Sequence, residues 1–216
     1  MKIRTEEDFQ DAIDKETSWR KKELFALKSN IARARKSAQE TALRAGIALL
    51  YAHWEGLVKN TAGYYLCYVS FQRKTYGDLK LNFLALSIKE ELEIFDNSIK
   101  ASRHNKIVSD IRSLEKQNSR IPYDGIIKTG SNLNSSIFIE IMETIGLDYD
   151  QYECDFVLLD NTLLKMRNEI AHGEHVEYLS LDENRFNEIY EVITGMMFRF
   201  VNQVSNAVTM KEFLRS

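Results

Sequence analysis

The sequence contains few of the residues that interrupt helices. Its 216 residues include a single proline and nine glycines, whereas a fold of many short strands needs such residues at its turns. Long segments instead repeat apolar residues at intervals of three and four, with little of the strict alternation that marks strands. A chain of this length can bury one sizeable core. We therefore expect an all-α protein with a single helical domain over residues 1–216.

Cysteine is also scarce. Cys67 and Cys154 are too few and too far apart to build a disulfide framework or a zinc site, and they are typical of free thiols in a reducing cytoplasm. The first residues, MKIRTEEDFQDAIDKE, are charged and lack the apolar stretch of a signal peptide. No run reaches the roughly 18 uninterrupted apolar residues of a membrane span. These absences predict a cytoplasmic protein without a membrane segment.

Positive charge is not in excess. The formal net charge is −3 and the pI is about 5.9, which excludes a uniformly basic protein that coats nucleic acid. Two stretches are nevertheless basic, residues 20–39 (RKKELFALKSNIARARKSAQ) and residues 98–120. Either stretch can be a solvated helix face or a track for an RNA backbone, and any contact with nucleic acid must be local.

Apolar periodicity outlines the first helices. A helix over residues 5–37, whole or broken near Ser29, begins with Thr5 as N-cap and three acids behind it. The next helix carries a seam at alternating spacings of four and three: Leu43, Ile47, Leu50, Trp54, Leu57, Thr61, Tyr64 and Tyr68. Gly56 and Gly63 lie within it and indicate close approach of a neighbouring helix or of substrate, because glycine costs about 1 kcal/mol inside a helix.

The middle of the chain changes in character. Residues 79–95 predict one amphipathic helix. Residues 97–132 are polar and basic, contain the single proline, and show little apolar periodicity. We expect this segment to form an insertion or excursion from the bundle, with one short hairpin.

Capping signals mark the last helices. Asn134 or Ser135 is expected to cap a short helix that ends at Gly146. A one-sided apolar stripe then leads to Gly173, which ends a further helix, and the S-x-x-E pattern of residues 180–183 predicts a capping box before the final one. The order of these elements predicts an antiparallel helical bundle with an insertion before its last core helices.

Arg167 and His172 lie at the end of the amphipathic stripe, in the stretch KMRNEIAHGEH (residues 165–175). A guanidinium matches the geometry of a phosphate and stays charged, and an imidazole gives or takes a proton near neutrality. The helix dipole favours the protonated form of a histidine in the last turn. Such a pair can cleave an RNA phosphodiester, since the ribose 2′-OH is an internal nucleophile and no metal is obligatory.

The spacing of the pair raises a difficulty. Five positions on an ideal helix separate two side chains by about 140°, so Arg167 and His172 do not share a face. They converge only if the helix end deviates at His172, if Arg167 reaches around, or if a second copy of the motif faces the first in a dimer. The same spacing also arises by chance at a solvent-facing helix end.

The residues around this motif resemble the HEPN family (higher eukaryotes and prokaryotes nucleotide-binding domain). Its ribonuclease branch carries an R-x(4–6)-H motif near the end of a bundle helix, matched here by Arg167, Asn168 and His172 in RNEIAHG. Residues 49–59 (LLYAHWEGLVK), residues 131–148 (SNLNSSIFIEIMETIGLD) and the final helix also resemble a prokaryotic subgroup linked to defence and toxin loci. The resemblance covers most of residues 40–206.

The resemblance implies a helical bundle that is usually a homodimer, with both motifs in a cleft between protomers. In the active branch it implies a metal-independent endoribonuclease without a cofactor, often a toxin or abortive-infection effector with an antitoxin or defence-system partner. By position, Arg167 would hold the scissile phosphate, His172 would act as general acid or base, and Asn168 would orient or bind phosphate. Other members are non-catalytic, so a module that binds a partner protein or nucleotide is the alternative. A structural helical protein in which the motif is coincidental is a third.

Glu55 and His53 flank Trp54 on the seam helix, and both are candidates to line the same cleft. Glu55 is the stronger of the two, as a supporting residue beside the phosphate. The alternative for Glu55 is a surface pair with Lys59 at i, i+4.

Two further groups have simpler interpretations. A possible metal cluster lacks the i, i+4 ligand pair of a helical zinc motif, and we expect no metal at His172, Glu174, His175 and Glu177. Tyr64, Tyr65 and Tyr68 of the seam helix can stack on bases, but the seam positions of Tyr64 and Tyr68 favour core packing.

Overall fold

The computed structural model describes residues 2–97, 99–173 and 181–215, and over these residues the regular elements are helices. In chain order they are α1 (Glu6–Arg33), α2 (Lys36–Phe71), η1 (Tyr76–Asp78), α3 (Leu81–Ser87), α4 (Lys89–Asp96), α5 (Ala101–Leu114), α6 (Ser135–Ile145), η2 (Asp150–Tyr152), α7 (Glu153–Leu158), η3 (Leu159–Leu164), α8 (Lys165–Ala171) and α9 (Glu183–Thr209). The predicted all-α class is confirmed. In the same residues, no helix is long and apolar enough to cross a membrane.

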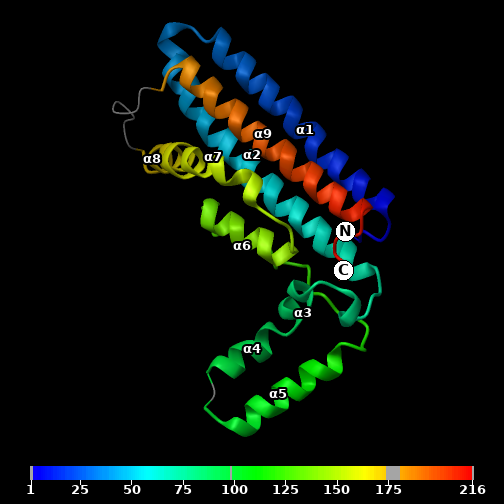
Figure 1. Ribbon diagram of the computed structural model, residues 1–216. Coiled ribbons are helices and arrows are strands. Elements are labelled where there is room, and N and C mark those ends of the chain that lie inside the picture. Colours follow the sequence, from blue (N-terminus) through cyan, green and yellow to red (C-terminus); the bar gives the residue numbers. More distant parts are fainter. Residues whose placement is uncertain (1, 98, 174–180, 216) are drawn as a thin grey trace.

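Three long helices form the body of the molecule. α1, α2 and α9 lie side by side, and α1 runs antiparallel to the other two, so that both termini lie at one end of the bundle (Figure 1). The shorter α6, α7 and α8 cover another side of α2. This arrangement places α2 at the centre, in contact with helices from both halves of the chain.

Local capping signals set most helix ends. Thr5 caps α1 in a capping box with Asp8, and α1 continues without a break past Ser29. Asn134 caps α6, and Gly146 ends it in the left-handed region at φ 70°. These caps were expected from the side chains that can accept a backbone hydrogen bond and from the glycine that tolerates positive φ.

The predicted capping box of α9 is wrong. Asp182 is the N-cap, and its side chain accepts a hydrogen bond from Arg185 N at 2.8 Å. Ser180, the predicted cap, lies outside the described residues. Aspartate caps a helix as well as serine does, so the sequence offered two N-cap candidates, Ser180 and Asp182.

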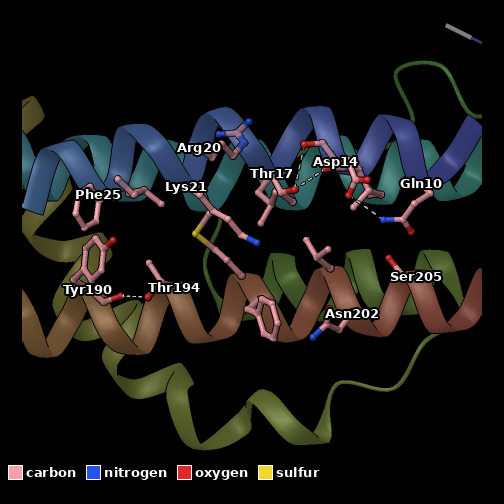
Figure 2. A pocket seen from close by; sticks show the side chains of 16 residues that line it. Gln10, Asp14, Thr17, Arg20, Lys21, Phe25, Tyr190, Thr194, Asn202 and Ser205 are labelled. Carbon is pink, nitrogen blue, oxygen red and sulfur yellow. Dashed lines mark hydrogen bonds between the residues drawn. The ribbon is translucent and has the colours of Figure 1, made fainter.

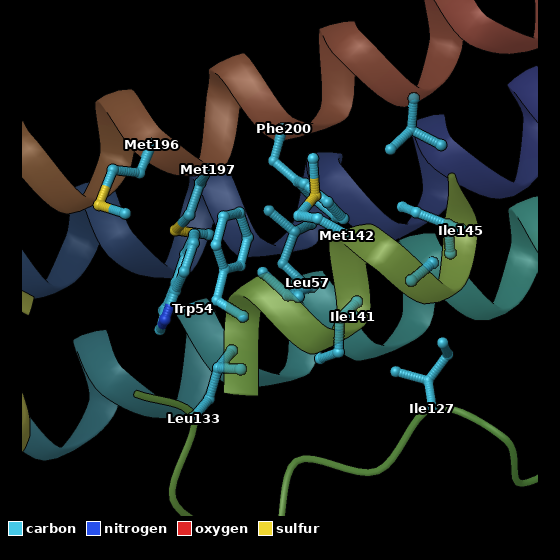
Figure 3. Packing of buried hydrophobic residues seen from close by; sticks show 14 of the residues in the cluster. Trp54, Leu57, Ile127, Leu133, Ile141, Met142, Ile145, Met196, Met197 and Phe200 are labelled. Atoms are coloured by element: carbon cyan, nitrogen blue, oxygen red, sulfur yellow. The ribbon is translucent and has the colours of Figure 1, made fainter. Parts of the chain in front are cut away.

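The seam of α2 forms the centre of the core. All eight predicted seam residues are buried except Tyr64, which is half-buried. Trp54 is fully buried and its ring lies 5.3 Å from that of Phe138 on α6. Figure 3 shows Met196, Met197 and Phe200 of α9 and residues of α6 converging on this part of α2. At about 25 cal/mol per Å² of apolar surface, such contacts dominate the stability of the bundle.

The segment between α2 and α6 differs from the prediction. Residues 79–95 form two helices, α3 and α4, which are separated at Ile88 (φ −110°, ψ 21°), in place of one. Residues 101–114 form helix α5, where we expected a hairpin. α4 and α5 project away from the bundle (Figure 1), and a small separate cluster anchors the base of this projection: Tyr76, Leu84 and Ile88, with Ile111 and Leu114.

A buried ionic network joins α1 to α2. Arg20 donates to Glu16 Oε1 from Nε at 2.9 Å and from Nη2 at 2.5 Å, and its Nη1 lies 3.2 Å from His53 Nδ1. Asn60 donates to the same oxygen of Glu16 at 2.8 Å. The first three side chains are 3–7% exposed. Because a buried charge is tolerated only when it is paired, this network specifies how α1 lies along α2.

The two glycines of α2 have different surroundings. A Cβ at Gly56 would lie 2.7 Å from Arg20 Nη2, so the predicted close approach occurs there and is made by the guanidinium. A Cβ at Gly63 would meet no described atom within 4 Å. Close approach of a neighbouring helix is therefore wrong for Gly63 among the described residues, and close approach of a substrate there stays a prediction.

This difference makes Gly56→Ala and Gly63→Ala a matched pair. Gly63→Ala should raise the free energy of unfolding by up to about 1 kcal/mol, because alanine favours the helix. Gly56→Ala gains the same propensity but displaces Arg20 from its partners, and should lower the free energy of unfolding by about 1–3 kcal/mol. Urea denaturation followed by circular dichroism measures both. Equal stabilisation by the two substitutions would show that Arg20 moves aside without loss.

Burial, and next the charge of Arg20, lower the pKa of His53 below its ordinary value. Glu23 acts in the opposite direction, with its Oε2 3.0 Å from His53 Nε2. Since an arginine can only donate, Nδ1 of His53 is the acceptor toward Arg20, and the neutral ring carries its proton on Nε2. His53 is therefore a neutral member of the network at neutral pH.

The lowered pKa predicts a pH dependence of stability. The unfolded chain protonates this imidazole near pH 6.5, while the folded chain binds the proton only at lower pH. The free energy of unfolding should therefore fall as the pH drops below about 6.5, and this contribution should level off below the folded pKa. His53→Asn keeps an acceptor for Arg20 but does not titrate, so the variant should lack this part of the dependence in urea titrations at several pH values. Identical pH dependence in both proteins would contradict the assignment.

Candidate active site

A π-helical turn precedes the helix that carries Arg167. η3 joins α7 to α8, and its wide turn rotates α8 about the helix axis relative to α7; such turns are rare and occur frequently at functional sites. Leu159, Leu163 and Met166 are buried across this junction. The apolar stripe predicted for this part of the chain thus continues into α8 and orients its polar face, which includes Arg167.

The guanidinium of Arg167 is held by three groups from two other segments. Its Cζ lies 4.0 Å from the centre of the Tyr51 ring on α2. Its Nη2 donates to the backbone oxygen of Ser131 at 2.7 Å and to Asn132 Oδ1 at 3.2 Å. Its Nε is buried and has no hydrogen-bond partner among the described residues. The guanidinium is therefore fixed in position, but not all of its hydrogen-bond donors have a partner among the described residues.

The turn that contacts Arg167 is itself held in place. Ser131 adopts φ 57°, a left-handed conformation that is unusual for a residue other than glycine. The backbone N–H of Leu133 donates to the hydroxyl of Tyr51 at 2.6 Å. Asp160 in the π-helical turn accepts from the backbone N–H of Ser135 at 2.8 Å. Tyr51 and Asp160 thus attach this turn to α2 and η3.

A hollow of about 280 Å³ opens beside the guanidinium, lined by Ala48, Tyr51, Ala52, Glu55, Ser131, Arg167, Ile170 and Ala171. Its lining combines the guanidinium of Arg167 and the carboxylate of Glu55 with small apolar side chains. Burial, and next the charge of Glu55, raise the pKa of Tyr51 above its ordinary value, so its phenol stays protonated at neutral pH. The hollow can therefore offer the guanidinium of Arg167 to an anionic group. It can also offer the carboxylate of Glu55 as an acceptor for a hydroxyl group of the same ligand.

Two of the four predicted site residues, Arg167 and Glu55, line this hollow. Asn168 follows Arg167 on α8 and is half-buried. His172 is exposed at the C-terminal end of α8 and does not line the hollow. Its backbone N–H donates to Asn168 O at 2.9 Å, so the helical hydrogen-bond pattern continues to His172, and Gly173 then ends the helix at φ 74°.

Sequence reasoning missed the residues that hold Arg167. Tyr51 lies four positions before Glu55 and so shares its helix face, a relation that identifies it once Glu55 is a candidate. Ser131 and Asn132 carry no comparable signal, because they belong to the polar segment that was expected to leave the bundle. Their role depends on contacts across more than thirty residues, Arg167 to Ser131 and Asn132.

The other histidine and metal candidates lie elsewhere or are not described. His53 is buried in the network with Arg20 and does not line the hollow. Glu174, His175 and Glu177 fall in residues 174–180, outside the described part of the chain. Among the residues that are described, no group of three or more histidine, cysteine, aspartate or glutamate side chains is arranged to hold a metal ion.

The burial of the tyrosines agrees with the seam prediction for Tyr68 and differs from it for Tyr64. Tyr65 and Tyr68 are buried in the core, whereas Tyr64 is half-buried. The ring of Tyr68 packs 6.0 Å from that of Phe9. Core packing therefore accounts for Tyr65 and Tyr68.

The two basic stretches differ in how their charges are used. In α1, Arg20 is committed to the buried network, and Lys28 Nζ lies 2.6 Å from Glu191 of α9. In α5, Arg103, Lys106 and Arg112 are exposed on the helix that projects from the bundle. Lys22, Arg33 and Arg35 of the first stretch are exposed as well, so both stretches present cations to solvent.

A larger hollow of about 540 Å³ lies between α1 and α9 (Figure 2). Its lining is largely apolar, with Leu24, Phe25 and Met197 among its side chains. Its one arginine, Arg20, is already bonded to Glu16, and none of its lining residues in the described chain is a histidine. Lys21 is a second cation in the lining, but this groove lacks the pairing of an arginine with a histidine that the sequence motif offers.

Three comparisons with known proteins were made, and one of them, with protein-family models, gave a match. A family model described as RiboL-PSP-HEPN matches residues 15–206, a range that includes most of α1, all of the hollow and both Arg167 and His172. Comparisons with curated proteins and with solved structures gave no match. The chain therefore belongs to the RiboL-PSP-HEPN family.

Proposed function

We propose that this protein is a metal-independent endoribonuclease that cleaves RNA with Arg167 and His172 at a cleft between two protomers. Membership of a HEPN family supports RNA as the substrate class. The observation that carries the proposal is the guanidinium of Arg167, which is held in place by Tyr51, Ser131 and Asn132 and lines a hollow. A guanidinium beside a hollow is suited to bind an anion such as a phosphate.

In the proposed reaction, Arg167 binds a non-bridging oxygen of the scissile phosphate and stabilises the charge that develops there. The ribose 2′-OH attacks the phosphorus and releases its proton to solvent, while the bond from phosphorus to the 5′ oxygen of the next nucleotide breaks. His172 protonates that oxygen as the general acid. Asn168 orients the phosphate, and Glu55 supports the site from the opposite helix as an acceptor.

The geometry of α8 supports a site shared between protomers. The helix keeps its hydrogen bonding to His172, so the angular separation of about 140° expected for five positions is retained. Arg167 cannot reach around the helix without giving up Tyr51, Ser131 and Asn132. A second copy of the motif, facing the first in a homodimer, supplies the missing imidazole.

The biological role that fits this activity is that of a toxin or anti-phage effector held in check by an antitoxin or defence-system partner. The alternative is a non-catalytic module that binds a partner protein or a nucleotide. One observation favours that alternative: within one protomer the hollow contains Arg167 but not His172. Cleavage assays separate the two.

Arg167→Ala and His172→Ala should each lower the rate of RNA cleavage by about 100-fold or more, because each removes a group that acts in the transition state. His172 is exposed and Arg167 is half-buried, so the melting temperature of each variant is measured to separate lost catalysis from lost folding. Fragmentation of RNA in the presence of EDTA, together with growth arrest on expression, measures the effect. Lys165→Ala, exposed on the same helix, is the control. Cleavage by either variant at the wild-type rate would exclude the assigned pair.

A mixed dimer tests whether the site is shared. Chains carrying Arg167→Ala and chains carrying His172→Ala are co-expressed with different tags, and the heterodimer is purified. In this heterodimer one protomer keeps the guanidinium of Arg167 and the other keeps the imidazole of His172. This heterodimer should recover part of the wild-type activity, whereas each variant homodimer stays inactive. An inactive heterodimer, or the failure to isolate any dimer, would contradict a site built across the interface.

A further inference from the structure

We propose that Tyr51 and the turn formed by residues 131–133 act as a clamp that positions Arg167 for phosphate binding. Tyr51 is the central positioning residue, because it contacts both the guanidinium and the turn. This inference rests on the proposed function, since it assigns how the phosphate-binding arginine of that site is held. It adds residues of α2 and of the segment before α6 to a site otherwise built on α8.

The stacked contact restricts the guanidinium to one plane. Tyr51 is 3% exposed, so its ring is fixed by the core, and the guanidinium carbon lies 4.0 Å from its centre. A cation over an aromatic face is attracted by the ring quadrupole. The ring therefore orients the plane of the cation.

The turn restricts the guanidinium within that plane. Ser131 O and Asn132 Oδ1 lie 2.7 Å and 3.2 Å from Nη2 and account for both of its hydrogens. Nε, which is buried, has no partner among the described residues. A phosphate oxygen must therefore be met by the remaining donors of Arg167, and the clamp decides which edge of the guanidinium faces the substrate.

The strained conformation of Ser131 supports a positioning role. A serine at φ 57° is held there only when its surroundings over-determine it, and such residues cluster at functional sites. The surroundings here include the hydrogen bond from Leu133 N–H to the Tyr51 hydroxyl at 2.6 Å and the complete burial of Leu133. This conformation allows the carbonyl of Ser131 to accept from Arg167, so the strain is stored where the cation is bound.

The clamp predicts different outcomes for two substitutions of Tyr51. Tyr51→Leu removes the aromatic face and the hydroxyl, and kcat for RNA cleavage should fall about 10- to 100-fold, as expected for a misplaced catalytic group, with KM nearly unchanged. Tyr51→Phe keeps the face and should recover most of the lost rate. Melting temperatures of both variants separate this effect from loss of folding.

A spectroscopic readout tests the clamp independently of activity. In ¹⁵N-labelled protein the Nε–Hε resonance of Arg167, assigned by its loss in Arg167→Lys, should be shifted upfield by the Tyr51 ring. The shift should disappear in Tyr51→Leu and persist in Tyr51→Phe. If Tyr51→Leu does not fold, Asn132→Ala is used, which removes one acceptor of Nη2 and should move the same resonance and lower kcat.

The outcomes distinguish this inference from the proposed function. The clamp is overturned if folded Tyr51→Leu leaves both the Arg167 resonance and kcat unchanged. Where Tyr51→Leu does not fold, the same result in Asn132→Ala overturns it. A resonance that responds as expected in a protein that does not cleave RNA supports the clamp and contradicts the nuclease.

Discussion

Tyr51 and Arg167 meet where α2 passes α8, and their contact at 4.0 Å fixes the position of the guanidinium on which the proposed site depends. The ring belongs to the most buried helix of the bundle, so its position is set by the core. Its hydroxyl binds the turn before α6, and that turn binds the guanidinium. Arg167 is consequently placed by tertiary contacts from two other segments of the chain, and α8 alone would leave it free to sample many rotamers.

One turn of α2 organises much of the molecule. Tyr51 faces α8, His53 joins the buried network with α1, and Trp54 packs on Phe138 of α6. Glu55 follows and lines the hollow beside Arg167. Neighbouring residues of similar polarity thus have unrelated roles, His53 in the joining of two helices and Glu55 in the candidate site, because consecutive side chains on a helix point about 100° apart.

Features with a local cause could be predicted from the sequence. The cap at Thr5, the end of α6 at Gly146 and the seam around Trp54 all depend on residues within a few positions of one another. Three other features could not be derived from the sequence. Several local patterns competed at the split at Ile88 and at the cap Asp182. The open space at Gly63 among the described residues depends on tertiary packing. In the site, Arg167 and Glu55 were identifiable from residue type and spacing, whereas Ser131 and Asn132 became visible only through contacts with a helix more than thirty residues away.

The chemistry of the RNA ends tests the central claim most directly. Attack by the ribose 2′-OH, with Arg167 on the phosphate and an imidazole as acid, leaves a 2′,3′-cyclic phosphate and a 5′-hydroxyl, and a chelator does not change it. Mass spectrometry of fragments produced by the purified protein in EDTA should therefore find these two ends. Fragments with 5′-phosphate ends, or cleavage that stops when divalent metal is removed, would contradict the account.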